Sequence, residues 1–167
     1  NLSVNSVVRD VQGLGWLNGK IYMTDTTQDD ILVFDPTLRL ITQVFDEDVF
    51  SGLSLRDGLT GNPANNSLFV LGPLGFSGSY DVFEISAANG SIIRSLSGDL
   101  WDSGLAVVGN SLYVGSQTTS KLRVYSLPNL TRLPDVTLPP SQFFFHTYGL
   151  GSDGVQGLVP TSFRYRD

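Results

Sequence analysis

The sequence predicts an all-β fold, a four-bladed β-propeller in which each blade is a sheet of four antiparallel strands. Two observations support this prediction. A Gly-Leu pair recurs at Gly13-Leu14, Gly58-Leu59, Gly104-Leu105 and Gly149-Leu150, so the four copies start 45, 46 and 45 residues apart. Between these pairs, short apolar runs alternate with turn residues, and no stretch shows the 3.6-residue period of a helix. A fixed period of this size, built from strands and turns, is typical of propeller blades.

The first unit shows the order of elements that defines a blade. It begins at Gly13-Leu14-Gly15-Trp16 and turns at Asn18-Gly19. Asn-Gly between β-rich runs is the strongest short hairpin signal, because both residues tolerate positive φ. Further strands are expected at 20–24, 31–34 and 39–45, with a polar loop after the first of these and a turn at Asp35-Pro36 before the last.

The second and third units repeat this order. In the second unit, strands are expected after Gly58-Leu59 at 67–71, 81–85 and 91–96, with turns at 62–66 and at Asn89-Gly90. In the third unit, they are expected at 105–108, 112–114, 122–125 and 132–138, with turns at Gly109-Asn110 and Pro128-Asn129. Each unit therefore provides four strands in sequence.

The fourth unit is incomplete. After Gly149-Leu150 it offers strands at 155–159 and 162–165 and no outer strand, whereas 2–8 alternates like a strand and has no neighbour in sequence. Pairing 2–8 with the last unit would close the ring and remove its open edges. We therefore expect one domain with blades at 11–50, 51–99, 100–140, and 141–167 plus 1–10. The alternative is a run of consecutive blades from a larger propeller of six to eight blades.

One unit carries a family resemblance. Its second and third strands, Ile21-Tyr22-Met23-Thr24-Asp25 and Asp30-Ile31-Leu32-Val33-Phe34-Asp35, resemble the YWTD repeats of lipoprotein-receptor ectodomains and the NHL-type repeats of other propellers. Met23 replaces the tryptophan of the YWTD motif, and the other units lack the Thr-Asp pair. The resemblance implies a propeller fold and ligand binding on one face. Those families usually have six or more blades, from which a four-bladed ring departs.

Composition limits the partners of this chain of 167 residues. Its formal net charge is −6 and it has only two lysines, Lys20 and Lys121, so no basic stripe is available for nucleic acid. No apolar run approaches the roughly 20 residues that span a bilayer, and membrane insertion is not expected. Residues 1–4 lack the layout of a signal peptide, so we expect a mature product or an excised segment. The absence of cysteine excludes disulfides and thiolate zinc sites.

Four N-glycosylation sequons occur, at Asn1, Asn65, Asn89 and Asn129. The three internal ones all fall in turns between the first and second, or the third and fourth, strands of a unit. In a propeller these turns open on one face of the disc. We therefore predict glycans at Asn65, Asn89 and Asn129 and a secreted or cell-surface location, the alternative being that these are only turn asparagines.

The opposite face carries the loops between the second and third strands and the connections between units. Aromatic and charged residues gather in these connections, and the candidate ligand-binding residues are Asp46, Phe50, Asp99, Trp101, Phe145 and His146. Large rings beside carboxylates suit a protein or a carbohydrate ligand. The alternative for the aromatic residues is packing between the blades.

Evidence for an enzyme is weak. His146 is the only histidine, so a multi-histidine metal site is impossible, and neither a nucleophile elbow nor a phosphate-binding loop occurs. No cofactor is expected apart from a possible calcium ion held by Asp25, Asp29 and Asp30, which could equally be solvated loop acids. We expect a non-enzymatic binding or assembly module. The alternatives are a small lyase or lactonase-like enzyme with a cation on Asp25, Asp46 and Asp99, and a structural repeat that polymerises.

Overall fold

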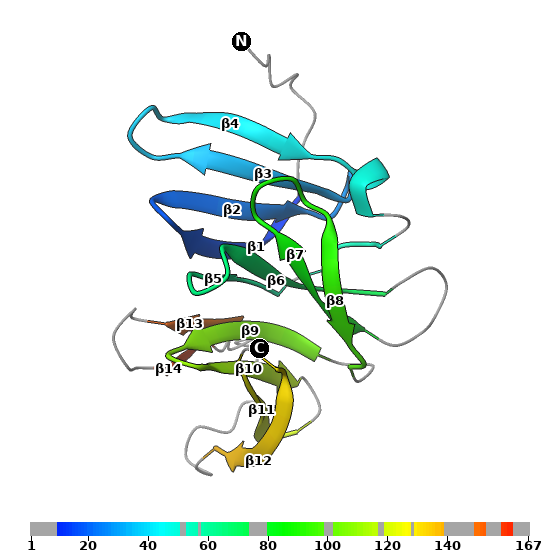
Figure 1. Cartoon of the computed structure of the whole chain (residues 1–167), viewed down its shortest axis with the longest axis vertical. Coiled ribbons are helices and arrows are strands. Elements are labelled where there is room, and N and C mark those ends of the chain that lie inside the picture. Colours follow the sequence, from blue (N-terminus) through cyan, green and yellow to red (C-terminus); the bar gives the residue numbers. More distant parts are fainter. Residues whose placement is uncertain are drawn as a thin grey trace, which may run out of the picture.

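The computed structural model describes residues 10–50, 53–56, 58–73, 80–98, 102–116, 119–127, 129–138, 149–152 and 158–161. These residues form three sheets of four antiparallel strands and one two-stranded sheet, and the first three sheets follow one another from top to bottom of the view (Figure 1). A short 3-10 helix, η1 (Glu47–Phe50), follows the first sheet. None of the described helices is long and apolar enough to cross a bilayer.

The strands of each sheet are consecutive in the chain. The first sheet contains β1 (Val11–Leu17), β2 (Lys20–Asp25), β3 (Asp30–Asp35) and β4 (Leu40–Phe45). The second contains β5 (Leu59–Asn62), β6 (Ser67–Gly72), β7 (Asp81–Ser86) and β8 (Ile92–Leu96). The third contains β9 (Asp102–Val108), β10 (Ser111–Ser116), β11 (Lys121–Ser126) and β12 (Thr131–Thr137), and the fourth contains β13 (Gly149–Ser152) and β14 (Leu158–Thr161).

The predicted hairpin turns are confirmed where Asn and Gly supply positive φ. Asn18 and Gly19, between β1 and β2, have φ of 49° and 81°, and Gly109, between β9 and β10, has φ of 55°. These left-handed values give the turn a twist that matches the twist of the flanking strands. The turn residues therefore set the register of each hairpin.

The inner strands β1, β5 and β9 lie side by side and run in the same direction. An added Cβ on Gly15 would overlap the Leu59 side chain and lie 3.2 Å from the Thr60 Cα, and further along both strands Gly61 lies against Trp16 and Leu17. Between β5 and β9, the Val107 amide donates to the Thr60 Oγ1 at 3.3 Å. Because each sheet starts from a parallel inner strand, corresponding turns lie at the same edge.

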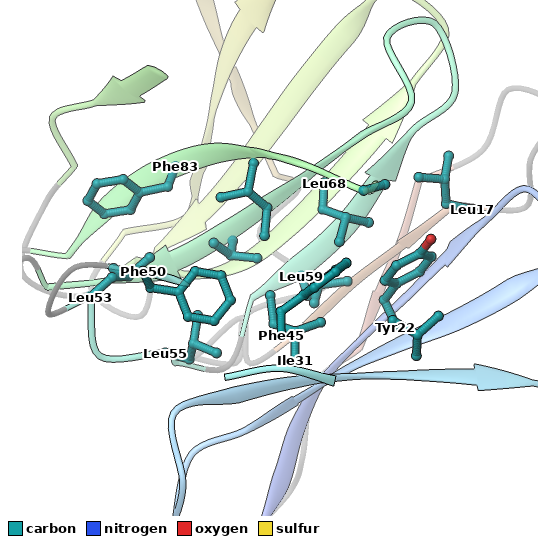
Figure 2. Packing of buried hydrophobic residues seen from close by; sticks show 14 residues of the cluster. Leu17, Tyr22, Ile31, Phe45, Phe50, Leu53, Leu55, Leu59, Leu68 and Phe83 are labelled. Carbon is teal, nitrogen blue, oxygen red and sulfur yellow. The ribbon is translucent and has the colours of Figure 1, made fainter. Parts of the chain in front are cut away.

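Two apolar cores lie between the three large sheets, one between each pair of neighbouring sheets. Strand β6 is buried on both sides, so that Leu68 and Val70 face the first sheet while Phe69 and Leu71 face the third. Figure 2 shows the core between the first and second sheets, where side chains of both sheets meet those of the segment that joins them. The labelled members are Leu17, Tyr22, Ile31, Phe45, Phe50, Leu53, Leu55, Leu59, Leu68 and Phe83.

Each outer strand of the three large sheets carries a β-bulge. The ladders between the third and fourth strands shift register once per sheet, which leaves one extra residue in β4, β8 and β12. Thr42 is the extra residue in β4, and its hydroxyl donates to the Val33 carbonyl at 3.3 Å. Ile93 has the same position in β8. A bulge bends the strand and increases its local twist.

The fourth sheet differs from the sequence prediction. Its second strand, β14 (Leu158–Thr161), continues past the predicted end at 159, because Pro160 pairs with Leu150 inside the strand; residues 155–157 of the predicted strand lie outside the described residues. In the described two-stranded sheet β14 has one partner only, and a proline is tolerated in such a position because not every amide donor is needed. Strand β13 packs beside β9, as Figure 1 also shows. The predicted strands at 2–8 and 162–165 lie outside the described residues, and so does the ring closure that depends on them.

Candidate functional site

The parallel inner strands give the array two opposite edges. We call the edge with the β1–β2, β3–β4, β5–β6, β7–β8, β9–β10 and β11–β12 turns the sequon edge, because Asn65, Asn89 and Asn129 lie there, and all three are exposed. The Asn18 Nδ2 donates to the Asn66 Oδ1 at 2.8 Å and joins two of these turns. The other edge, with the β2–β3 turn and the connections between sheets, is the loop edge. It contains the candidate ligand-binding residues that the structure describes.

Asp29 at the loop edge stabilises the connection between the first and second sheets. Its Oδ1 accepts hydrogen bonds from the Leu55 amide at 2.8 Å and from the Ser54 hydroxyl at 3.1 Å. Asp29 itself has φ of 53°, a left-handed value that Asp tolerates better than most residues. The carboxylate therefore caps the segment that leads into β5.

Thr24 and Asp25, the pair on which the family resemblance depends, are both fully buried. The Thr24 Oγ1 accepts from the Gly13 amide at 2.7 Å and donates to the Arg56 carbonyl at 3.3 Å, and it thereby connects β1 and β2 with the segment before β5. The Asp25 Oδ1 accepts from the Thr27 amide at 3.1 Å. Thr24 therefore joins the first sheet to the segment before β5, and Asp25 stabilises the start of the β2–β3 turn.

The predicted calcium ligands lie close together in the chain but do not form a described metal site. Asp25 and Asp30 are register partners across the β2–β3 ladder, and Asp29 precedes Asp30. Asp29 is engaged by Ser54 and Leu55. Among the residues described, no group of three or more Asp, Glu, His or Cys side chains could hold a metal ion. Calcium binding stays a prediction from the acidic loop.

The candidate ligand-binding residues divide into three groups. Asp46 is exposed at the loop edge. Phe50 is fully buried in the first core, where it packs at the end of η1, and so it offers no surface to a ligand (Figure 2). This corrects the assignment of Phe50 to the binding surface, because closing the first core requires a large apolar side chain after β4. Asp99, Trp101, Phe145 and His146 lie outside the described residues.

A polar network that sequence reasoning missed crosses all four strands of the second sheet near the sequon edge. Glu84 on β7 is 1% exposed, and its Oε1 accepts from the Ser67 hydroxyl at 2.5 Å, the Asn62 Nδ2 at 3.2 Å and the Asn65 Nδ2 at 3.5 Å. Its Oε2 accepts from the Arg94 Nε at 2.5 Å. Three strands and a sequon asparagine thus surround one buried carboxylate.

The donors around Glu84 decide its ionisation. Burial alone raises the pKa of this carboxyl, but the hydrogen bonds from Ser67 and Arg94, the charge of Arg94 and the hydrogen bond from Asn62 together bring the pKa below its ordinary value of 4.5. The carboxylate is therefore charged in the folded protein at neutral pH.

A pH dependence of stability follows from the lowered pKa. Because Glu84 binds its proton less tightly in the folded than in the unfolded chain, its contribution is fully present above pH 4.5 and is lost as pH falls through the folded pKa. We expect the free energy of unfolding, measured by urea titration at a series of pH values, to fall below pH 4.5. In Glu84→Gln this fall should be shallower, and an unchanged slope would contradict the assignment.

The third sheet contains a second buried ion pair. Asp102, at the loop-edge end of β9, pairs with Arg123 on β11, and their side chains are 0% and 14% exposed. Because the two strands are not neighbours, the pair bridges β10. Strand β9 begins at Asp102, three residues before the start of the strand expected at 105–108, so the sequence pattern did not predict that this carboxylate lies in a sheet.

Comparison with known proteins identifies the fold and no family. No protein-family model matches the chain, and no curated protein matches it in sequence. Among solved structures, the chain is similar to Kuenenia stuttgartiensis hydrazine synthase, with a TM-score of 0.59 and 13% identity over 92% of this chain and 43% of that one. It is similar to the computationally designed Ika4 protein, with a TM-score of 0.56 and 14% identity over 96% of both chains.

A third similar structure is a protein of unknown function from Bacteroides caccae, with a TM-score of 0.52 and 11% identity over 86% of this chain and 49% of that one. The chain thus spans less than half the length of this protein and of the hydrazine synthase chain, and nearly all of the designed protein. At such low identity the likeness concerns the fold alone. Together with the antiparallel sheets, it identifies a β-rich repeat protein with a propeller-like fold.

Proposed function

We propose that this chain is a non-enzymatic β-propeller module of a secreted or cell-surface glycoprotein, and that it binds or assembles through surfaces away from its sequon edge. The observation that carries the proposal is the position of the three internal sequons. Asn65, Asn89 and Asn129 are all exposed, and the parallel inner strands bring their turns to one edge of the array. Glycans there would leave the loop edge and the ends of the array free for a protein or carbohydrate ligand.

The proposal includes the complete propeller. The four sheets would be consecutive blades, and residues 2–8 would form the missing outer strand of the last blade, next to the predicted strand at 162–165. The contacts of β1 with β5, β5 with β9 and β9 with β13 support this order, because neighbouring inner strands pack in this way around a propeller axis. A cation-dependent enzyme has weaker support, since Asp25, one of its three predicted ligands, is fully buried and accepts a hydrogen bond from the Thr27 amide.

The mass of the natively purified protein, before and after enzymatic removal of N-glycans, tests this function. We expect a mass above 18.1 kDa by discrete sugar increments, with occupancy at Asn65, Asn89 and Asn129. Asn110 lies in an exposed turn at the same edge without a sequon and is the internal control for site mapping. A bare mass of 18.1 kDa would reject the glycoprotein and remove the reason for choosing the opposite edge.

A second candidate, a structural repeat that assembles with its own kind, is favoured by a different observation. Two large apolar side chains of β1, Leu14 and Trp16, are 63% and 60% exposed beside the residues that the structure describes. Large exposed apolar patches mark interaction sites. Self-assembly through these side chains is compatible with glycans at the sequon edge.

A further inference from the structure

The hydroxyl residue of one sequon is buried in the second sheet. The sequon at Asn65 begins in the exposed β5–β6 turn and ends at Ser67, the first residue of β6. Ser67 is 0% exposed, and its hydroxyl donates to the Glu84 Oε1 at 2.5 Å. Because β6 is a central strand, Ser67 also pairs with Asn62 on one side and with Ser86 on the other. The folded sheet therefore covers one of the two residues that define this sequon.

The sequon at Asn89 ends in an exposed hydroxyl instead. Asn89 lies in the β7–β8 turn, and Ser91 directly precedes β8. The Ser91 hydroxyl and amide both donate to the Asn89 Oδ1, at 2.9 and 3.2 Å. Both residues are exposed, and among the described strands β8 has β7 as its one neighbour. Segments at the edge of a sheet, with few buried contacts, open at a lower free energy than its central strands.

N-glycosylation needs both defining residues of a sequon. An oligosaccharyltransferase moves the oligosaccharide from a polyprenyl diphosphate to the asparagine. The Nδ2 atom attacks the anomeric carbon and releases one proton, and a C–N bond replaces the C–O bond to the diphosphate, which leaves with the electron pair. The enzyme cannot contact the Ser67 hydroxyl while this residue is 0% exposed, so exposure of Asn65 alone is not sufficient.

We infer that Asn65 accepts a glycan only before the second sheet has folded, whereas Asn89 still accepts one in the folded chain. The inference rests on the proposed glycoprotein and adds the order of two events at Asn65. Sugar transfer comes first, and the pairing of β6 with β5 and β7 comes second. Once that pairing is complete, an unmodified Asn65 stays unmodified.

The folded network is compatible with a glycan that was added earlier. Asn65 is exposed, and among the described residues its Nδ2 donates to one acceptor, the Glu84 Oε1 at 3.5 Å. A glycosylated Nδ2 retains one proton, which is sufficient for one such bond. The shorter hydrogen bonds of Glu84, from Ser67 and Arg94, do not involve Asn65. The sheet that prevents addition of the sugar therefore does not exclude the sugar itself.

The test uses the full chain, produced without glycans and purified in its folded state. It is incubated with a purified oligosaccharyltransferase and a lipid-linked oligosaccharide, and peptide mass spectrometry gives the initial rate at each site. The unfolded reference is the double variant Leu55→Asp/Leu112→Asp, which places a carboxylate in each of the two apolar cores and leaves all sequons intact. Far-ultraviolet circular dichroism shows that the wild type is folded and that the reference is not.

We expect both sites to react in the unfolded reference. Folding should slow the reaction at Asn65 at least about tenfold more than at Asn89, since access to Ser67 requires breaking a hydrogen bond to a buried charge. Equal slowing at the two sites would overturn the inference, and so would a folded chain that reacts at Asn65 as fast as the unfolded reference. A reference that does not react at Asn65 would overturn it too, because the sheet would then not be the cause.

The result is separate from the mass test of the glycoprotein. A natively purified chain without sugar would reject the glycoprotein, and the rates on folded and unfolded chains would still decide whether the second sheet makes Asn65 inaccessible. A natively glycosylated chain whose two sites are slowed equally by folding would keep the glycoprotein and reject the order of events.

Discussion

Gly61→Ala is expected to destabilise the protein by about 3 kcal/mol, near the top of the range for overpacked cores. A Cβ at this position would overlap the Trp16 carbonyl oxygen and lie 2.9 Å from the Leu17 Cβ. The obstacle is backbone in the neighbouring sheet, so no side-chain rotation relieves it, and β5 must move away from β1. For a chain of this size the midpoint of thermal unfolding should fall by roughly 10 °C, measured by calorimetry.

Gly109→Ala is the matched control. Gly109 has φ of 55° and no atom within 4 Å of an added Cβ, so this variant tests the cost of the left-handed backbone alone. We expect a loss of about 1 kcal/mol. Equal losses at the two glycines would mean that the close approach of β1 and β5 contributes nothing to stability.

Arg94→Met should cost about 3 kcal/mol at neutral pH, because it leaves the buried Glu84 carboxylate without its charged partner. Because the Arg94 side chain is 30% exposed, most of the lost stability arises at Glu84. The Glu84 carboxylate is 1% exposed and cannot replace the ion pair by hydrogen bonds to water. The pKa of Glu84 should rise, since Arg94 is among the causes of its depression. Urea unfolding at pH 7 and NMR titration of the glutamate side chain measure the two effects.

An exposed ion pair provides the comparison for Arg94→Met. Arg132 pairs with Asp135 on β12, with 42% and 32% of the two side chains exposed, and its guanidinium lies 5.1 Å from the centre of the Tyr125 ring. Arg132→Met should cost no more than about 1 kcal/mol. If both variants lost the same stability, burial of the carboxylate would not be the reason for the effect at Glu84.

Local signals were sufficient to predict most of the fold. The Asn-Gly and Gly-Asn turns contain residues with positive φ, and such turns favour hairpins. The flanking strands show a two-residue alternation of side chains. The twelve strands of the first three sheets accordingly lie close to their predicted positions. The fourth unit was harder because Pro160 lies inside a strand. Ring closure cannot be derived from local signals, because it depends on contacts between the first and last units.

The side-chain sites were harder to predict than the strands. Asn62, Ser67 and Arg94 surround Glu84 only when all four strands of the sheet are in register. The spacing of these residues in the sequence does not predict that they meet. The prediction for Phe50 was wrong for a similar reason. An aromatic residue after an acidic run gives the same sequence pattern whether its side chain faces solvent or packs into a core, as that of Phe50 does. The repeated Gly-Leu pair predicted the length of the repeat. The contact of Leu59 with Gly15 could not be predicted, because it depends on the position of the neighbouring sheet.

The bulges in the outer strands have a consequence for the protein in concentrated solution. Each large sheet ends in a strand whose regular hydrogen-bonding row is broken by one extra residue, and β12 also contains Pro134, which has no amide proton to donate. A foreign β-strand therefore finds no continuous template along these rims, and lateral stacking into cross-β fibrils is opposed. A chain with exposed apolar side chains on its first sheet can thus remain resistant to amyloid formation along its sides.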